Sequence, residues 1–270
     1  MTGCPPLIIL HDYFETAEGG GRLCLELGRA IGADLAYGFK AKNHPFFQVK
    51  YRAGRELGLN AYSRLRVWKQ FKLIRAFSRK TRFLAEYRIA VFSGFYSVCA
   101  AKNHPNDKNI YYCHTPPRFM YDQKDAFKAQ AGWWGRPILK IFNDYYRPIY
   151  EDSVSRMDLV ITNSKNVQSR IKKYLGLDSV VVFPPCDLKK YHYLDQKDFY
   201  LSMARLDPLK RVDQIVQAFL KMPDKNLVVI SGGPEMPRIR HMAENACNIK
   251  IMGMVDEKSL IKLLGECIAT

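Results

Sequence analysis

The stretch that decides the fold is "YLSMARLDPLKRVD", residues 200–213. An apolar run from Tyr200 to Ala204 ends at a turn signal, Asp207-Pro208, and a helical pattern follows. Asp207 suits the N-cap of that helix and Pro208 suits its first position. A buried strand that leads through a short turn into a helix is the repeating unit of a parallel α/β sheet.

The same alternation extends over the whole chain. In the second half, strands are predicted at 199–204, 227–231 and 249–252, and helices at 209–221, 235–245 and 256–266. In the first half, strands are predicted at 6–10, 34–39, 89–95, 109–115, 158–164 and 180–183, and helices at 18–31, 50–88, 137–156 and from the N-cap Ser164 to about Tyr174. Repeated units of this kind predict two Rossmann-like, doubly wound parallel-sheet domains.

A polar stretch after "FPPCD" (183–187) marks the expected boundary, which gives domains at 1–187 and 188–270. "CIAT" (267–270) has the pattern of a fourth strand of the second domain. In a doubly wound sheet of order 3-2-1-4-5-6, only the first half would then be present. We therefore expect the second domain to be incomplete.

The composition is that of a folded globular protein, with 47% hydrophobic and 25% charged residues. No apolar run approaches the roughly 18–20 residues of a membrane span, and the N-terminus lacks the basic region of a signal peptide. We expect a cytosolic chain. The cysteines, at positions 4, 24, 99, 113, 186, 247 and 267, form no CxxC pair. They are predicted to be free, mostly buried thiols of a reducing compartment.

The basic charge is concentrated in one segment. Lys and Arg number 42 and Asp and Glu 26, a net charge of +16. Residues 50–88 hold twelve basic residues against Glu56 and Glu86, so twelve minus two, or +10, lies there. A bias of this size indicates an anionic partner: nucleic acid, anionic lipid or a phosphorylated ligand.

As a helix, residues 64–84 would be amphipathic. The apolar side would carry Val67, Phe71, Ile74, Phe77 and Leu84, and the basic side Arg64, Lys69, Lys72, Arg75 and Arg79, with Trp68 near its edge. Such a helix can lie on an anionic membrane surface. The alternative is a domain helix with a solvated face. Nucleic-acid binding is disfavoured, because the chain contains no recognised nucleic-acid module.

Two cations, Arg205 and Lys210, follow the first strand of the second domain. Open α/β sheets bind ligands at the carboxyl ends of their strands, and a helix N-terminus is expected at the same place. The combination predicts a diphosphate site. A solvated, charged loop is the other interpretation of this spacing.

Glycines and a histidine occupy similar positions elsewhere. Gly232 and Gly233 follow the next strand, where glycine lets the backbone approach a ligand or simply makes the turn. His114 follows the strand at 109–115 and precedes two prolines. It is a candidate ligand contact or a structural residue. The glycine run 19–21 opens the first helix, where it admits a ligand or packs helix against strand.

Several segments, in this order, resemble one protein family. They are "GGGRL" (19–23), "YCHTPPR" (112–118), "ITNSKNV" (161–167), "VVFPPCD" (181–187), "SMARLDPLKRVDQIVQAF" (202–219), "VVISGGPE" (228–235) and "IKIMGMVDEKSL" (249–260). The chain resembles retaining group 1 glycosyltransferases of the GT-B fold, which use nucleotide-sugar donors. "HTPPR" is similar to the form found in mannosyltransferases of surface-polysaccharide assembly.

The resemblance implies a role for each matching residue. Arg205 and Lys210 match the pair that holds the donor diphosphate, and His114 matches the histidine that faces the transferring sugar. The turns near donor phosphate, nucleotide and acceptor are matched by Gly19, Gly20, Gly21, Gly232, Gly233, Gly253 and Val255. It implies transfer of a hexose, with mannose indicated, to a polysaccharide or lipid-linked acceptor, with retention. No DxD-like pair appears, so we expect a metal-independent enzyme without a cofactor, peripheral to the inner face of the membrane.

Two departures from the family pattern leave other interpretations open. Arg22 follows Gly21 directly, where the family often has Glu, which puts sugar or acceptor contacts there in doubt. The family's E-x7-E segment would lie beyond residue 270. A non-catalytic remnant, or one half of a split transferase, is the alternative expectation for the chain as given.

Overall fold

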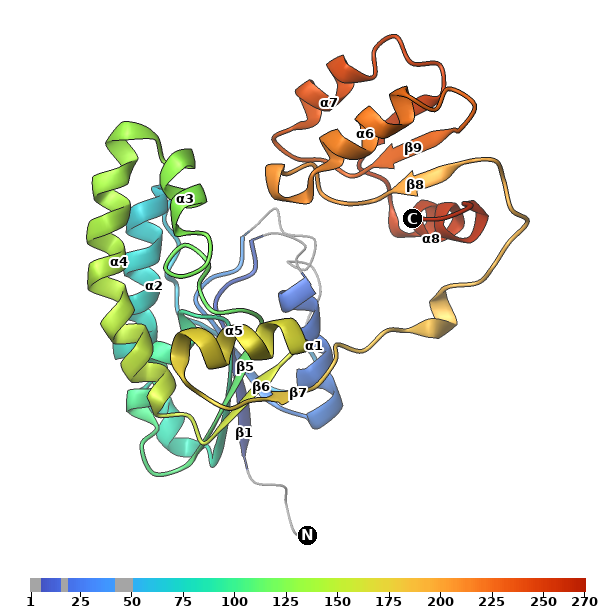
Figure 1. Ribbon diagram of the computed structural model, residues 1–270. Coiled ribbons are helices and arrows are strands. Elements are labelled where there is room, and N and C mark those ends of the chain that lie inside the picture. The colour runs from blue at the N-terminus through green and yellow to red at the C-terminus, as the bar shows by residue number, and fades with distance from the viewer. Residues whose placement is uncertain (1–5, 16–18, 42–50) are drawn as a thin grey trace. The chain divides into compact units, whose positions relative to one another are not determined.

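The computed structural model describes residues 6–15, 19–41 and 51–270. The chain forms two compact units, Met1–Pro185 and Cys186–Thr270. The division falls two residues before the boundary expected at 187 and 188. Each unit contains its own parallel sheet (Figure 1).

The first unit is built on a seven-stranded sheet in which every neighbouring pair is parallel. In spatial order its strands are β3 (Glu56–Gly58), β2 (Asp34–Tyr37), β1 (Leu7–His11), β4 (Ile89–Ser93), β5 (Lys108–Cys113), β6 (Leu159–Thr162) and β7 (Val180–Val181). Strand order therefore reverses between β1 and β4, as in a doubly wound fold.

Both faces of this sheet are buried. On β1, Ile8 and Leu10 belong to one hydrophobic cluster and Ile9 belongs to the other. Alternate side chains of a strand point to opposite faces, so helices must cover both sides. The helices are α1 (Gly19–Ile31), α2 (Arg66–Arg79), α3 (Lys124–Gln130), α4 (Gly132–Ser155) and α5 (Lys165–Leu175), with 3-10 helices at Arg82–Glu86 and Ser97–Asn103. The prediction of a parallel α/β sheet is confirmed.

The basic segment 50–88 does not form the single helix that was predicted for it. It contains β3, α2 and the 3-10 helix Arg82–Glu86. Leu84 is fully buried in that 3-10 helix and does not lie on the apolar face of α2. Lys69 was also wrongly assigned to the solvated face: its ammonium pairs with Glu15 at 2.7 Å, and its side chain is 17% exposed.

The long helix α4 begins at Gly132, and Pro137 lies inside it, not at its start. Gly132 has a φ of 63°, which separates α4 from the unpredicted helix α3. Phe142, Tyr146 and Tyr150 are buried along α4, so tertiary packing stabilises the helix despite the prolines.

The second unit has a three-stranded parallel sheet of order β10 (Ile249–Gly253), β9 (Leu227–Ile230) and β8 (Tyr200–Ser202). Its helices are α6 (Val212–Leu220), α7 (Met236–Met242) and α8 (Glu257–Glu266), with 3-10 turns at Leu188–Lys190 and Pro208–Lys210. One core cluster, which includes Leu206, Val216 and Val229, lies beneath them.

Residues after α8 run along the side of β8 that faces away from β9. The Ile268 amide donates to the Phe199 carbonyl at 2.8 Å, and the Leu201 amide donates to the Ala269 carbonyl at 2.9 Å. The neighbouring Tyr200 amide instead points towards β9 and donates to Asn226. The segment thus lies where a fourth strand was expected, although no strand is assigned there.

Among the described cysteines, Cys24, Cys99 and Cys113 are buried, and burial raises the pKa of each thiol. Cys186 and Cys247 are exposed, which corrects the expectation of mostly buried thiols. Cys4 lies outside the described residues.

Candidate functional site

In the first unit, polar side chains meet where β1, β4 and β5 end. The sheet register pairs His11 with Ser93, and β5 lies on the other side of β4. The Ser93 hydroxyl lies 2.9 Å from His114 Nε2 and 3.3 Å from His11 Nδ1, which also lies 3.0 Å from the Ser93 carbonyl oxygen. One buried hydroxyl therefore joins two imidazoles at the carboxyl edge of the sheet.

The glycine run comes close to these rings. A Cβ added at Gly20 would lie 3.4 Å from His114 Nε2. One at Gly21 would lie 3.3 Å from the Phe14 ring and 3.7 Å from His11 Nε2, whereas one at Gly19 would meet nothing within 4 Å. The structure thus brings Gly20 and Gly21, but not Gly19, against the histidines. An added Cβ would be in ordinary contact with His114 at Gly20 and in slightly tight contact with Phe14 at Gly21, so the glycines let the backbone of α1 pack closely against these rings.

Asp12, which directly follows His11, fixes the loop after β4. Its carboxylate accepts hydrogen bonds from the backbone amides of Phe95, Tyr96 and Ser97 at 2.7–2.9 Å. Burial raises the pKa of Asp12 to about 6, against the three amides that lower it. Asp12 and Ser93 were missed as site residues in the sequence; their positions at the ends of neighbouring predicted strands were the available signal.

The loop that carries His114 is held by an ion-pair cluster. Arg118 donates to Asp122 at 2.8 Å, and Arg170 of α5 lies 3.5 Å from the same carboxylate. Desolvation raises the pKa of Asp122, but Arg118 and then Arg170 lower it below its ordinary value. The side-chain amide of Asn163 also donates to the His114 backbone carbonyl at 3.2 Å. The arginine of "HTPPR" is thus engaged in positioning the loop.

In the second unit, the loops after β8, β9 and β10 are joined by backbone hydrogen bonds. The Leu206 amide donates to the Gly232 carbonyl at 3.0 Å, and the Glu235 amide donates to the Leu206 carbonyl at 3.0 Å. The Ser231 amide donates to the Gly253 carbonyl at 2.7 Å. The structure therefore assembles the turns that contain Arg205, Gly232, Gly233 and Gly253 at one edge of the sheet.

These turns require unusual backbone conformations. Gly233 has a φ of 155°, and a Cβ there would lie 2.2 Å from the Leu206 carbonyl oxygen. Gly253 is buried with a φ of 78°, and Ser231, a non-glycine residue, has a φ of 92°. Strained residues of this kind persist where the surrounding structure holds them, often at ligand sites. Val255 is half-buried and precedes Asp256, which caps α8.

The cationic turn after β8 differs in detail from the expected helix start. Asp207 accepts from the Leu209 amide at 3.1 Å and Pro208 opens the turn, as predicted, but Pro208–Lys210 is a 3-10 turn. Arg211 then adopts φ 52° and ψ 36°, so α6 begins at Val212 and not at 209. The predicted α-helix N-terminus beside Arg205 and Lys210 is therefore wrong. A single 3-10 turn there is capped by Asp207.

Both predicted diphosphate ligands are accessible. The Arg205 side chain is 51% exposed and lies 3.4 Å from Asp207 Oδ2. Lys210 is exposed at the end of the turn. Ser202, at the end of β8, is 6% exposed, and within the described residues its hydroxyl has no hydrogen-bond partner. Each side chain can donate to an oxyanion, which suits a phosphate-bearing ligand.

Within 6–15, 19–41 and 51–270, no group of three or more His, Cys, Asp or Glu side chains is placed to hold a metal ion. Over the same residues, none of the helices combines the length and apolar character that would take it across a bilayer.

Solved structures share this architecture. HepE from Anabaena, in complex with UDP and glucose, superposes with a TM-score of 0.67 at 11% identity over 93% of this chain and 70% of that chain. The lipopolysaccharide outer core galactosyltransferase WaaB superposes with a TM-score of 0.56 at 9% identity, over 95% and 70%. A UDP-N-acetylglucosamine 2-epimerase from Rickettsia bellii gives a TM-score of 0.57 at 12% identity, over 98% of this chain and 73% of that chain. At these identities the likeness defines the class of fold, the GT-B fold.

One curated relative is similar in sequence. The alpha-1,3/1,6-mannosyltransferase ALG2 of Candida glabrata is 26% identical over 165 residues, which make up 54% of this chain and 34% of that enzyme. The matched part thus spans about a third of the relative's length. No protein-family model matches the chain. The relative and the GT-B structures together support the predicted resemblance to group 1 glycosyltransferases.

Proposed function

We propose that this chain acts in glycosyl transfer and binds a nucleoside-diphosphate sugar as the donor. The observation that carries the proposal is the carboxyl edge of the second sheet. There a cationic turn with Arg205 and Lys210 is bonded to the glycine turn at Gly232 and Gly233. The UDP complexes of the structurally similar HepE support a nucleotide-sugar donor.

The chemistry follows from where charge develops. When the bond between the anomeric carbon and the diphosphate oxygen breaks, negative charge grows on the leaving nucleoside diphosphate. Arg205 and Lys210 would stabilise that charge, as preorganised cations do in other group transfers. An acceptor hydroxyl oxygen then takes the vacated position, with release of its proton and with retention of configuration. We propose that the reaction needs neither a metal nor a cofactor.

We propose that His114 faces the transferring sugar. The Ser93 hydroxyl lies 2.9 Å from its Nε2, and Gly20 lets the start of α1 pack closely against the ring, since even an added Cβ would already be in van der Waals contact with it. A fixed imidazole orients a bound sugar with little loss of entropy, and orientation contributes substantially to rate.

The finer features of the proposal concern the substrates and the location. The sequence relative transfers mannose, which supports mannose as the hexose. We propose a polysaccharide or lipid-linked acceptor and a cytoplasmic location peripheral to the inner face of the membrane. The basic surface of α2 supports a membrane location, because exposed cations favour an anionic lipid surface.

The test is titration calorimetry of the chain with both UDP and GDP, because the proposal does not specify the nucleobase of the donor. Arg205→Ala and Lys210→Ala should each weaken binding by about 1.5–3 kcal/mol, the range for charge-assisted contacts. Lys225→Ala and Arg240→Ala, exposed cations elsewhere in the second unit, serve as matched controls with unchanged affinity.

Unchanged binding in both Arg205→Ala and Lys210→Ala would show that these residues belong to a solvated, charged loop and do not bind the diphosphate. Loss of transferase activity in the presence of EDTA would contradict the proposed metal independence. A sugar-transfer assay with UDP- and GDP-hexoses then identifies the donor.

A further inference from the structure

The surface formed by α2 and α4 combines a row of cations with an apolar stripe. On α2, Trp68, Lys72, Arg75 and Arg79 are exposed, and their spacing of four, three and four residues places them on one side of the helix. The side chains of Leu73, Ile74 and Phe77 on the other side are buried. We call the exposed row the basic ridge.

The second component lies on α4 and was not predicted from the sequence. Trp134, Ile138, Ile141 and Tyr145 follow the same spacing of four, three and four residues, so they too share one side of a helix. Their exposed fractions are 83%, 48%, 66% and 47%. We call this row the apolar stripe. Soluble proteins rarely expose aligned large side chains without a partner for them.

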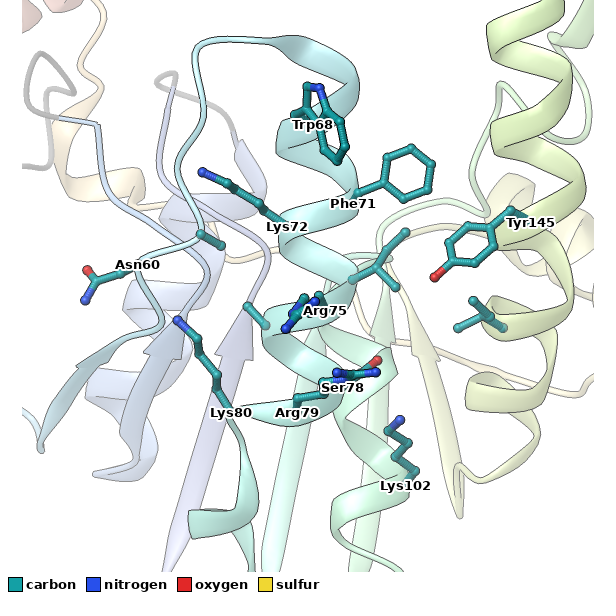
Figure 2. Close-up of a pocket in the computed structure, with 14 residues that line it drawn as sticks. Asn60, Trp68, Phe71, Lys72, Arg75, Ser78, Arg79, Lys80, Lys102 and Tyr145 are labelled. Atoms are coloured by element: carbon teal, nitrogen blue, oxygen red, sulfur yellow. The ribbon is translucent and has the colours of Figure 1, made fainter.

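The basic ridge and the apolar stripe are continuous. The Phe71 ring lies 6.3 Å from Trp68, between centroids, and 5.3 Å from Tyr145. Figure 2 shows Phe71 and Tyr145 on facing sides of the space between α2 and α4. That space is part of a depression of about 850 Å³ whose lining includes Lys72, Arg75, Arg79, Lys80, Lys102, Tyr145 and Ile149, and no acidic residue.

The cations near the apolar stripe and the basic ridge fall into two groups, those that form ion pairs and those that do not. On α4, Lys140 pairs with Asp144 at 3.0 Å and Arg147 pairs with Glu151 at 2.8 Å, so these cations are neutralised locally. Within the described part of the chain, Arg75, Arg79 and Lys102 form no ion pair, and they are therefore available to an external anion.

We propose that the basic ridge and the apolar stripe together form a surface that docks on an anionic bilayer. The stripe, led by Trp134, would enter the boundary between headgroups and acyl chains, while the ridge and Lys102 bind lipid phosphates. Tryptophan and tyrosine favour this boundary because one part of each ring is apolar and another is polar. Charge complementarity favours the bilayer as the occupant, because lipid phosphates match the unpaired cations and the headgroup–acyl boundary accepts the exposed aromatic and aliphatic side chains beside them.

This inference deepens the membrane location in the proposed function and rests on it. The chain offers a direct probe, since its three tryptophans, Trp68, Trp133 and Trp134, all belong to α2 and α4. Their fluorescence should shift to the blue and be quenched by bromine-labelled acyl chains when vesicles of phosphatidylcholine and phosphatidylglycerol are added. Pure phosphatidylcholine vesicles should have a much smaller effect.

Variants separate the two components. Arg75→Gln, Arg79→Gln and Lys102→Gln combined should weaken vesicle partitioning by about a hundredfold, at roughly fivefold for each cation near an anionic surface. Ile138→Ser with Ile141→Ser should leave a weak, salt-sensitive adsorption in which bromine quenching is lost. Matched controls are Lys165→Gln, Lys172→Gln and Lys173→Gln combined, on α5, and Leu188→Ser with Tyr193→Ser, which should bind as the parent chain does.

The inference is overturned if the tryptophans show no shift or quenching, if the combined ridge variant binds as well as its control, or if the serine variant keeps full quenching. Tighter binding to RNA or DNA at physiological salt would also overturn it. Dimerisation through the stripe without vesicle binding would identify a second copy as the occupant instead. Nucleotide titration on the same preparations tests the proposed donor site separately, so failure of one does not imply failure of the other.

Discussion

The carboxyl edges of the two sheets are built from the same elements but present opposite kinds of side chain. In the first unit, Ser93 is buried and joins His11 to His114. In the second unit, Arg205 and Lys210 stand exposed on a turn. The first edge is a hydrogen-bonded cluster that fixes the position of its rings, and the second edge is a cationic surface.

The difference indicates a division of labour. A buried polar cluster in which each group is satisfied by another is rigid, and it can orient a ligand. Exposed cations lose little hydration in the free protein and are available to a polyphosphate, whose charge offsets the cost of ordering them. Three comparisons test whether hydrogen bonding makes the first edge rigid and whether charge defines the second edge.

The largest effect is expected at the glycine turn of the second edge. At Gly233, a Cβ would lie 2.2 Å from the Leu206 carbonyl oxygen at a φ of 155°, so Gly233→Ala forces the turn to move. We expect the second unit to lose about 4 kcal/mol, from backbone strain and overpacking together, and to lose nucleotide binding. Hydrogen exchange of amides in β8 and β9 measures the loss.

Gly232→Ala is the matched control for that change. Its Cβ would lie 3.4 Å from the flexible Met254 side chain, an ordinary contact. It should cost well under about 1 kcal/mol. Equal losses in the two variants would show that the second edge does not depend on the close approach at Gly233.

The next effect concerns pH. The pKa of Asp12 is raised from 3.8 to about 6, chiefly by burial, so the folded first unit holds this proton more tightly than the unfolded chain. Its contribution to stability is fully present below about pH 4 and is lost as the pH rises through about 6. The difference corresponds to about 3 kcal/mol at most. Denaturation of the parent chain and of Asp12→Asn at pH 4 and pH 7 measures it.

The second unit supplies a case of opposite sign. Desolvation raises the pKa of Asp213, but Arg211 and then Arg238 lower it below its ordinary value. Its contribution should be present near neutral pH and lost on acidification, as the difference from Asp213→Asn would show. If both differences follow pH in the same direction, the electrostatic contrast between the units is wrong.

The smallest effect compares two buried serines, each at the end of the strand that leads to its edge. Ser93→Ala should cost about 1 kcal/mol and change the ¹⁵N shifts of His114, because the ring loses its hydrogen bond. Ser202→Ala should be close to neutral for stability, since its hydroxyl has no partner among the described residues. A Ser93→Ala variant with unchanged His114 shifts would remove Ser93 from the positioning of the ring.

Much of the fold could be predicted from local pattern. Strands such as β4 and β9 are short apolar runs bounded by turns, and Ser164 caps α5 with a 3.3 Å hydrogen bond from the Val167 amide, as expected. The same rules failed where packing outweighed local preference. Pro137 signals a helix start, yet the buried aromatic side chains of α4 continue the helix through it.

The positions of the candidate-site residues in the fold could be predicted from the sequence, but the contacts between them could not. Strand ends and glycine turns placed His114, Gly20, Arg205 and Gly233 at the right edges of their sheets. The bond from Ser93 to His114 depends on which strands are neighbours, and strand order is not written in any local stretch.

The sequence specified the alternation of strands and helices, the turns and the sum of charge, because these depend on residues close together in the chain. Which charges are available depended on tertiary packing. Lys69 and Arg75 are six residues apart on one basic helix, but Lys69 lies against Glu15 and the rings of Tyr13 and Phe39, whereas Arg75 faces outward. Rotation of α2 about its axis is set by the burial of Leu73, Ile74 and Phe77 against the sheet, and that burial decides which side chains remain exposed to bind a partner.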